Sequence, residues 1–385
     1  MPQVQNGRYE LSVFIDDMDI IASGCLFVSA SLYESIYAHI PSCELEVVVP
    51  KQLMDQRSIV DGSKLRFEIQ FNFEKGKPKE SYTYRVYCIK RLTQEQEYIN
   101  IKLDGLLDFY EGFTSSNKYN ALATTGEIFN KIAQQNYITA QIDTTDDKQL
   151  WIGGEKNVLN FMQYMSQRGW INDTSCMIWY LDRHRILVYK DLTSLIAQRS
   201  DGIYTFKQTD APEKEKLTYG YTDCHAEINS GAENIYQGGY GMDDYYFNFL
   251  EYKQEQVSAK KAVAWSNLFN INKELSKGLN DTLCPIYVGN HHPHHALACV
   301  QNQRLLATYS TYTILDSQFF QPYRLGQIVN LDFTYARDPN LKVDALTGIR
   351  IIDSIRINIT VSAITSKVEL AMQGLNGRSL VQEVY

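Results

Sequence analysis

Alternating apolar and polar residues predict β-strands over most of the first hundred residues. The run KLRFEIQF has the two-residue period of a half-buried strand, with its charged and polar side chains on the opposite face from Leu65, Phe67, Ile69 and Phe71. YTYRVYCIKRL and EYINIKLDGLL repeat this pattern, and GKPK at 76–79 predicts a turn. CELEVVVP ends at Pro50, which cannot donate a ladder hydrogen bond. This spacing predicts a small antiparallel barrel or sandwich.

From about Ser115 the period changes to that of an α-helix. TTGEIFNKIAQQN predicts a helix capped by Thr124 or Thr125, and its apolar face comprises Ile128, Phe129, Ile132 and Ala133. NVLNFMQYMSQRGW predicts a second helix that ends before Gly169, with an apolar face of Val158, Leu159, Phe161, Met162 and Met165. The strands CMIWYL and RILVYK follow, joined by a tight turn over 182–185. We interpret this region as a small α+β lobe and its Met and aromatic stripe as core.

The last third of the chain begins irregularly and returns to β periodicity. KQTDAPEKEK predicts a polar linker or loop, and the Gly- and Tyr-rich segment at 230–252 predicts a long surface excursion that becomes ordered only against a partner. ALACVQNQRLLATY predicts a helix from Ala296 to about Thr308. RLGQIVNLDF begins a strand at Gly326, and SKVELAMQG turns Val368, Leu370 and Met372 inward. GIRIIDSIRINIT predicts a strand whose one apolar face comprises Ile349, Ile351, Ile355, Ile357 and Ile359. Asp353 is the one polar residue on that face.

Composition narrows the class of protein. A chain of 385 residues is longer than one hydrophobic core of ordinary size can hold, so we expect two to four lobes. The 27 Tyr and 16 Phe suit strands and wet interfaces, and a formal net charge of -8 argues against a protein that grips DNA by its phosphates. Neither a signal peptide nor a long apolar span is predicted. The seven cysteines contain no CxxC pair. We interpret four of them as buried thiols of a reducing cytoplasm: Cys43, Cys88, Cys176 and Cys299.

Four histidines stand together in NHHPHHAL at 290–297, namely His291, His292, His294 and His295. Pro293 suits the first position of the following helix and breaks the 291/295 spacing that a helical metal pair would need. Cys299, one turn after His295, is the best local argument for a metal, but two ligands are too few and no HExxH occurs. We interpret the cluster as a solvated loop and helix start. A metal gathered on a symmetry axis and a catalytic metal remain alternatives.

Other chemical signals are weak. The carboxylate pairs Asp16–Asp17, Asp146–Asp147 and Asp243–Asp244 are interpreted as turn and surface acids, although a glycosidase pair stays open because its members need not be close in sequence. There is no GxGxxG, GxxxxGK[ST] or GxSxG motif. We therefore predict no catalytic, cofactor-binding or metal-binding residues, and a structural or binding protein that is not an enzyme.

The order of parts resembles the baseplate hub proteins of contractile phage tails. This family is related to the hub part of type VI secretion spike proteins and to phage late control protein D. The resemblance rests on the helix and hairpin at 155–190, on LGQIVNLDF with its glycine before a strand, and on the closing hairpin GIRIIDSIRINITVSAITSKVELAMQG. It extends from about Gly7 to Gly374. The needle domain of the secretion spikes is missing at Tyr385, and the segment at 230–252 and the histidine cluster have no family counterpart.

The resemblance implies a β-rich α+β fold with two tube-type antiparallel β-barrel domains and an inserted α+β domain. The first barrel would occupy residues 1–112 and the inserted domain 113–205. An irregular Tyr- and Gly-rich excursion with a linker and a helix start would fill 206–300. A helix and the second barrel would occupy 301–385, completed by strands from 202–230.

The resemblance also implies a function. Such a hub is a homotrimer in the virion tail baseplate, assembled in the host cytoplasm, that adapts the sixfold tail tube to the threefold central spike. Its partners would be the spike, the tail tube or tube-initiator protein and other baseplate proteins. DNA would only pass through its lumen, and no membrane insertion is expected. Tyr245, Tyr246, Phe247 and Phe249 are candidates for an assembly contact. The alternatives are a tube-end or distal tail protein, a cell-wall hydrolase, and a carbohydrate-binding β protein.

Overall fold

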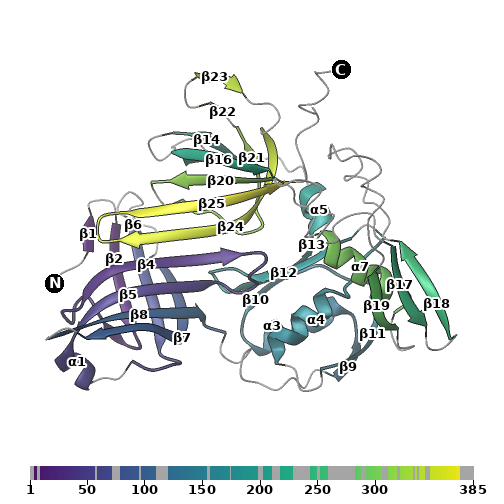
Figure 1. Cartoon of the computed structure of the whole chain (residues 1–385), viewed down its shortest axis with the longest axis horizontal. Helices are drawn as coiled ribbons and strands as arrows, with labels where there is room; N and C mark the ends of the chain where they lie inside the picture. Colours follow the sequence, from purple (N-terminus) through teal and green to yellow (C-terminus); the bar gives the residue numbers. More distant parts are fainter. Residues whose placement is uncertain are drawn as a thin grey trace.

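The computed structural model describes most of the chain. The described residues are 4–6, 9–56, 59–71, 79–94, 97–109, 120–153, 157–173, 175–197, 203–209, 217–228, 243–248, 252–258, 282–287, 292–305, 311–318, 321–332, 334–335, 338–342 and 347–372. Within them no helix has the length and apolarity needed to cross a bilayer. Figure 1 shows an elongated molecule built around one large sheet.

The first lobe of this sheet is antiparallel throughout. Its strands follow the order β1-β2-β6-β7-β8-β5-β4, and β3 pairs with β2. Their bounds are β1 Val4–Asn6, β2 Tyr9–Ile15, β3 Met18–Asp19, β4 Leu26–Ser35, β5 Ser42–Pro50, β6 Lys64–Phe71, β7 Glu80–Gln94 and β8 Tyr98–Leu107, with the short helix α1 at Lys51–Gln56. The predicted alternation in β6 is confirmed, since Leu65, Phe67 and Ile69 are fully buried. Of the predicted turn at 76–79, only Lys79 lies within the described residues.

The second lobe gathers strands from both sides of the irregular region. Its path is β15-β14-β21-β24-β25-β20-β16. The bounds are β14 Tyr204–Gln208, β15 Thr218–Tyr221, β16 Asp223–Ile228, β20 Thr311–Ser317, β21 Ile328–Leu331, β24 Gly348–Thr360 and β25 Ile364–Met372. The expectation of a purely antiparallel lobe is wrong, because β14 runs parallel to both of its neighbours. Parallel pairing of this kind cannot be made by a two-residue hairpin.

The two lobes are fused through one antiparallel pairing. The C-terminal half of β24 pairs with β4 in register from Ser354 opposite Ser35 to Thr360 opposite Ser29. The first residues of β24, Gly348 to Ile351, pair with β21, while β25 runs along the other edge from Ile351 to Ile359. One strand thus belongs to both lobes, and fifteen strands form a single sheet (Figure 1).

The partner change in β24 occurs at a β-bulge. The register with β25 shifts between Ile352 and Ser354, which leaves Asp353 as the extra residue. The predicted single isoleucine face is therefore wrong. Ile352, opposite Leu370, shares a face with Ile355, opposite Val368, whereas Ile351 lies on the other face in a separate buried cluster. A bulge inverts the alternation, and the buried misfit Asp353 is the only sequence signal for it.

The α+β domain confirms the predicted helices and hairpin. α3 (Thr125–Gln135) begins at Thr124 with a capping box to Glu127 and buries the predicted face, and α4 (Val158–Ser166) buries its predicted face except for half-buried Leu159. β12 (Met177–Leu181) and β13 (Ile186–Asp191) form the hairpin, to which β10 (Thr139–Ile142) adds in parallel. β9 (Asn120–Ala123) pairs with β11 (Gln149–Ile152), and α5 spans Leu192–Ala197.

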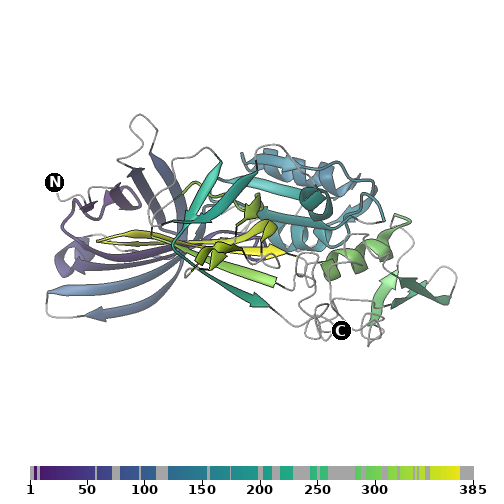
Figure 2. The ribbon, with the colours of Figure 1, turned by 90° about the horizontal axis from the view of Figure 1, so that it is seen from above.

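Smaller elements flank this domain. α7 runs from His295 to Leu305, and residues 306–310 of the helix predicted to reach Thr308 lie outside the described residues. β17 (Asp243–Asn248), β18 (Lys253–Ser258) and β19 (Thr282–Tyr287) form a separate sheet, seen from above beside α7 in Figure 2. β22 (Thr334–Tyr335) and β23 (Asp338–Lys342) form a hairpin.

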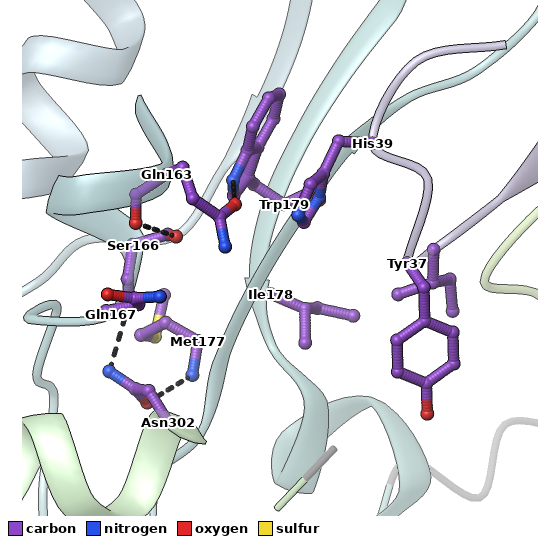
Figure 3. A pocket seen from close by; sticks show the side chains of 10 residues that line it. Tyr37, His39, Gln163, Ser166, Gln167, Met177, Ile178, Trp179 and Asn302 are labelled. Atoms are coloured by element: carbon purple, nitrogen blue, oxygen red, sulfur yellow. Dashed lines mark hydrogen bonds between the residues drawn. The ribbon is translucent and has the colours of Figure 1, made fainter. Parts of the chain in front are cut away.

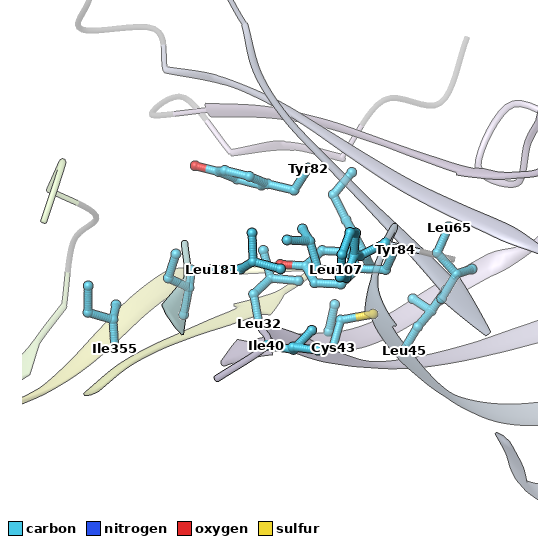
Figure 4. Close-up of a cluster of buried hydrophobic side chains, with 14 of the residues drawn as sticks. Leu32, Ile40, Cys43, Leu45, Leu65, Tyr82, Tyr84, Leu107, Leu181 and Ile355 are labelled. Carbon is cyan, nitrogen blue, oxygen red and sulfur yellow. The ribbon is translucent and has the colours of Figure 1, made fainter. Parts of the chain in front are cut away.

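The main hydrophobic core is continuous across the three parts of the molecule. Figure 4 shows Leu181 of the α+β domain and Ile355 of the second lobe beside Leu32 and Tyr84 of the first lobe. Cys43, Cys176 and Cys299 are buried free thiols as predicted, whereas Cys88 is only half-buried. Burial raises the pKa of the Cys43 and Cys176 thiols, so both stay protonated and act as small apolar side chains.

A buried arginine joins the three parts where they meet. Arg183, at the tip of the β12–β13 hairpin, donates from Nη1 to Glu34 Oε1 of β4 at 2.5 Å, and its backbone N–H donates to Glu34 Oε2 at 2.9 Å. Its Nη2 donates to the Tyr323 carbonyl of the second lobe. Both charged side chains are 4% exposed. Burial raises the pKa of Glu34 while Arg183 opposes that rise, so the ion pair is stable only with both partners present.

Replacing Arg183 by Met should therefore destabilise the fold strongly. The change leaves the Glu34 carboxylate buried without its cation, and we expect a loss of about 3–5 kcal/mol in the free energy of unfolding. Urea denaturation measures this loss. The double variant Glu34→Gln/Arg183→Met should lose less than the single variant, because it removes both charges. A single variant as stable as the parent would contradict the assignment.

Asp353 should make stability depend on pH. Burial, and then the nearby Glu369, raises the pKa of Asp353 from 3.8 to about 8. Below pH 4 both the folded and unfolded states carry the proton. From pH 4 to 8 only the unfolded state ionises, so the folded state loses about 1.4 kcal/mol for each pH unit. We therefore expect Asp353→Asn to be increasingly more stable than the parent as pH rises across this window.

Chemical denaturation at several pH values tests this expectation. Asp17→Asn is the matched control, because it removes one formal charge from an exposed turn. A difference between Asp353→Asn and the parent that stays constant from pH 4 to pH 8 would show that Asp353 is ionised in the folded protein.

Candidate functional site: a polar sheet face shared by both lobes

One face of the fused sheet is polar across five strands, from β25 through β24, β4 and β5 to β8. The register places matching residues of these strands side by side in rows. One row consists of Thr365, Asn358, Ser31, Glu44 and Asp104, and the next consists of Lys367, Arg356, Tyr33, Ser42 and Leu106. Directly opposite residues of antiparallel strands point to the same side. The polar surface therefore crosses the seam between the lobes without interruption.

The other face of the same strands is core. Ile357, Leu32, Cys43 and Gly105 form one row there, and the first three are buried. Gly105 is required by this packing, since a Cβ at that position would lie 2.7 Å from the Cys43 sulfur. Only the polar face of these five strands is therefore available to a partner or to a solvent-filled space.

Charges at the β5–β8 end of this face, which we call the polar face, neutralise one another. Lys90 Nζ lies 2.7 Å from Asp104 Oδ2 and 3.2 Å from Glu44 Oε1, and Lys102 Nζ lies 2.9 Å from Glu44 Oε2. Hydrogen bonds from Lys102 and then Lys90 lower the pKa of Glu44, and bonds to Asp104 and Glu44 raise the pKa of Lys90. Lys90 and Lys102 are thus each matched by a carboxylate, which reduces their attraction for an external anion.

The seam itself carries a shallow groove. Its volume is about 120 Å³, and it is lined by Ser29, Ser31, Glu44, Glu46, Lys102 and Thr360, among others. Asn100 Nδ2 donates to Glu46 Oε1 at 3.2 Å, and Arg356 lies over the Tyr33 ring at 5.0 Å. Hydroxyl, amide and paired charged groups of this kind bind water well. They contain no cysteine or histidine that would serve as an activated nucleophile or base.

The histidine cluster faces inward, so its interpretation as a solvated loop is wrong for two members. His292 is 3% exposed and His295 7%. His292 Nε2 donates to the Arg168 carbonyl at 3.1 Å, and burial lowers the pKa of this histidine, which favours the neutral ring. His294 stacks on Trp170 with ring centroids 3.8 Å apart. The cluster thus docks α7 on the α+β domain, a tertiary contact that has no signal in the local sequence.

Details of this cluster also differ from the prediction. The helix begins at His295, so Pro293 lies before the helix and not at its first position. Cys299 Sγ lies 3.9 Å from His295 Nε2, and His291 lies outside the described residues. Across the described part of the chain, no group of three or more His, Cys, Asp or Glu side chains is arranged to hold a metal ion.

The three carboxylate pairs have different environments. Asp16 and Asp17 are exposed at a turn, as predicted. Asp147 contradicts the prediction of a surface acid, because it is completely buried. It accepts hydrogen bonds from the backbone N–H groups of Thr125 at 2.8 Å and Trp170 at 2.9 Å, and from the Thr125 and Thr145 hydroxyls. Asp147 therefore fastens the start of α3 to the segment after α4, which is a structural role.

The Tyr-rich segment contributes a strand to a peripheral sheet. Residues 245–247 lie in β17, which pairs with β18 and with β19. Phe249 lies outside the described residues, as do 229–242. The assembly contact predicted for Tyr245, Tyr246, Phe247 and Phe249 therefore stays a prediction.

Sequence comparisons give no relative, whereas structural comparisons do. No protein-family model matches the chain, and no curated protein matches it. The fold is similar to that of the tail protein of Neisseria meningitidis MC58, with a TM-score of 0.57 and 9% identity over 96% of this chain and 98% of that one. It is also similar to the 43 kDa tail protein of prophage MuSo2 from Shewanella oneidensis, with a TM-score of 0.55 and 9% identity over 94% and 97%.

A third similar structure comes from a secretion system. A chain of the half-lidded Francisella PdpA-VgrG complex matches with a TM-score of 0.51 and 10% identity, covering 94% of this chain and 57% of that one. At such identities the likeness concerns the fold. The predicted β-rich α+β fold of phage tail hubs and secretion spikes is confirmed at that level.

Proposed function

We propose that the protein is the structural hub of a phage tail baseplate. The observation that carries this proposal is the continuous polar face, which unites two sheet lobes of one chain into one wall. The fold shared with two tail proteins over nearly their whole length supports it. In this proposal the hub acts by its shape and surface and not by catalysis, and it resides in the virion tail after assembly in the host cytoplasm.

The two-lobed chain suits an adaptor between symmetries. Three copies around an axis would present six sheet lobes on one side, matching a sixfold tail tube, and three α+β domains that keep the threefold symmetry of a spike. Both lobes belong to one sheet, so each pair would move as a rigid unit. The partners proposed are the tail tube or its initiator, the central spike and other baseplate proteins.

The polar face would line the channel of such a trimer. Its opposite face is core, and Lys90 and Lys102 are neutralised by Glu44 and Asp104, so this part of the wall would be wetted and would attract phosphates only weakly. DNA would pass along the wall without remaining bound to it.

The first test is the native mass of the purified protein. Three chains of 44.3 kDa give a trimer of about 133 kDa, which we expect by light scattering or native mass spectrometry. A hexamer would favour a tube-end protein, and a monomer at every concentration tried, also with tube and spike proteins present, would contradict the hub proposal.

The same mass measurement also tests whether the histidine cluster or the four aromatic residues hold the trimer together. We expect the trimer to survive a chelator, because His292 and His294 already make contacts within the chain. Serine at all four of Tyr245, Tyr246, Phe247 and Phe249 should weaken the trimer if β17 makes an assembly contact. An unchanged mass would remove these aromatic residues from the proposed interface.

Charge reversal on the polar face should create DNA binding. Glu44→Lys/Glu46→Lys removes the partners of Lys102 and Asn100 and leaves Lys90 only Asp104. We expect affinity for a short duplex to rise at least about tenfold at low salt and to fall steeply with added salt. Fluorescence anisotropy measures the dissociation constant. Asp16→Lys/Asp17→Lys is the matched control, with the same change in net charge at a distant turn. Equal binding by both variants would show that the polar face has no special access to DNA.

A further inference from the structure

The outer edge of the hairpin in the α+β domain is closed within the chain. Asn302 Oδ1 accepts from the Met177 N–H at 2.9 Å, and the His39 carbonyl accepts from the Leu181 N–H at 2.8 Å. Asn302 and His39 both line a cavity of about 290 Å³, together with Trp179 (Figure 3). A strand from another molecule would therefore find little room at this edge, whereas the large sheet has edges of a different kind.

The two lobes of the large sheet repeat one arrangement of five strands. The order is β6-β7-β8-β5-β4 in the first lobe and β21-β24-β25-β20-β16 in the second. Every neighbouring pair in both series is antiparallel. The long hairpin β7–β8 thus corresponds to β24–β25, β5 corresponds to β20, and β4 corresponds to β16.

The two long hairpins also bend at equivalent points. The register of β7 with β8 shifts between Val86 and Cys88, directly after the last pair that β7 makes with β6. The register of β24 with β25 shifts between Ile352 and Ser354, directly after the last pair that β24 makes with β21. In each lobe, therefore, a bulge marks the point where the outgoing strand of the hairpin leaves its first neighbour.

Residue types in the returning strands give the correspondence residue by residue. KLD at 102–104 in β8 and KVE at 367–369 in β25 place an acid opposite the residue that follows each bulge. Thr93 lies opposite the residue two positions before KLD, and Asn358 lies opposite the residue two positions before KVE. Thr93 and Asn358 consequently hold equivalent positions in the two hairpins.

The strands β4 and β16 correspond in the same way. Through β5, Ser31 lies in the same row as Asp104, the acid of KLD. Through β20, His225 lies in the same row as Glu369, the acid of KVE. Ser31 and His225 are therefore equivalent residues of the two lobes.

One of the two possible joins is made within the chain. After its bulge β24 pairs with β4, which places Asn358 opposite Ser31. Among the strands that the structure describes, β7 after its bulge pairs only with β8, and β16 pairs only with β20. These two edges lie at opposite ends of the series β7-β8-β5-β4-β24-β25-β20-β16, which Figure 1 shows from bottom to top. The chain thus ends in two edges that are equivalent to those joined in its own seam.

Details at both edges are compatible with strand addition. An exposed lysine at an edge usually opposes pairing. Lys90, the extra residue of a second register shift in β7, instead turns back over its own sheet and lies 2.7 Å from Asp104 Oδ2. In β16 the Cys224 N–H donates to Asp223 Oδ1 at 2.8 Å, as expected for a strand with no neighbour on that side.

We propose that β7 of one copy pairs antiparallel with β16 of the next copy, in the register of the β24–β4 seam, with Thr93 opposite His225. Each copy would offer one edge and accept the other, so three copies would close a wall of 24 strands, eight from each copy. The join between copies would then repeat the join between lobes, as a ring of six equivalent lobes requires. This inference rests on the proposed hub function, because it concerns how the three copies meet.

Disulfide trapping tests this register. Thr93 and His225 would be directly opposed, and antiparallel strands hold such residues within reach of a disulfide. Mild oxidation of Thr93→Cys/His225→Cys should therefore yield a covalent trimer of about 133 kDa on a non-reducing gel. Asn358→Cys/Ser31→Cys is the matched positive control, because the same geometry occurs within one chain and should give an internal disulfide at 44.3 kDa.

Further variants separate the proposed pairing from chance cross-linking. Thr93→Cys/Asp223→Cys, which is displaced by two residues, and each single cysteine variant should give at least about tenfold less covalent trimer. Equal cross-linking of Thr93→Cys with either partner would overturn the proposed register.

Native mass under reducing conditions separates this inference from the hub function. A trimer that forms no disulfide between positions 93 and 225, although the positive control forms its own, would overturn the proposed interface and leave the hub function standing. A monomer at every concentration would contradict both.

Discussion

The architecture depends on a single strand that serves two sheet lobes. β24 offers one edge to β25 from Ile351 to Ile359, and it divides the other edge between β21 and β4. If β24 were straight, β21 and β4 would continue each other along one edge of a flat sheet. The bulge at Asp353 bends the strand at the division, and the Asp353 carbonyl accepts from the Ile36 N–H at 3.0 Å, so the turn after β4 is fixed at that point.

The α+β domain is oriented by a few buried polar contacts at this junction. Arg183 reaches Glu34 of the first lobe and Tyr323 of the second, and His39 stacks on Trp179 with ring centroids 4.4 Å apart. Directional contacts of this type cost free energy to bury, and they fix one arrangement among the many that apolar packing would allow. The polar face and the α+β domain consequently keep a fixed relation to each other.

Local sequence patterns correctly predicted the elements that are determined by interactions between residues close in sequence. The capping box at Thr124, the apolar face of α3, the β12–β13 turn and the alternation of β6 all follow from neighbours within a few residues. The burial of His292, the burial of Asp147 and the inverted isoleucine face of β24 depend on residues far away in sequence, such as Arg168, Thr125 and Val368. The polar face was missed for the same reason, because only register brings Asn358, Ser31 and Glu44 into one row.

The seam between β4 and β24 has a mechanical consequence. Its pairs, from Ser354 to Thr360, lie side by side with hydrogen bonds perpendicular to the strands. A pull that slides the lobes past each other along the strand direction loads all of these bonds in shear at the same time. A pull that peels one strand from the other breaks them in succession at much lower force. The molecule is therefore mechanically anisotropic, stiff to sliding and weak to peeling, and the direction of an applied load decides whether the lobes stay joined.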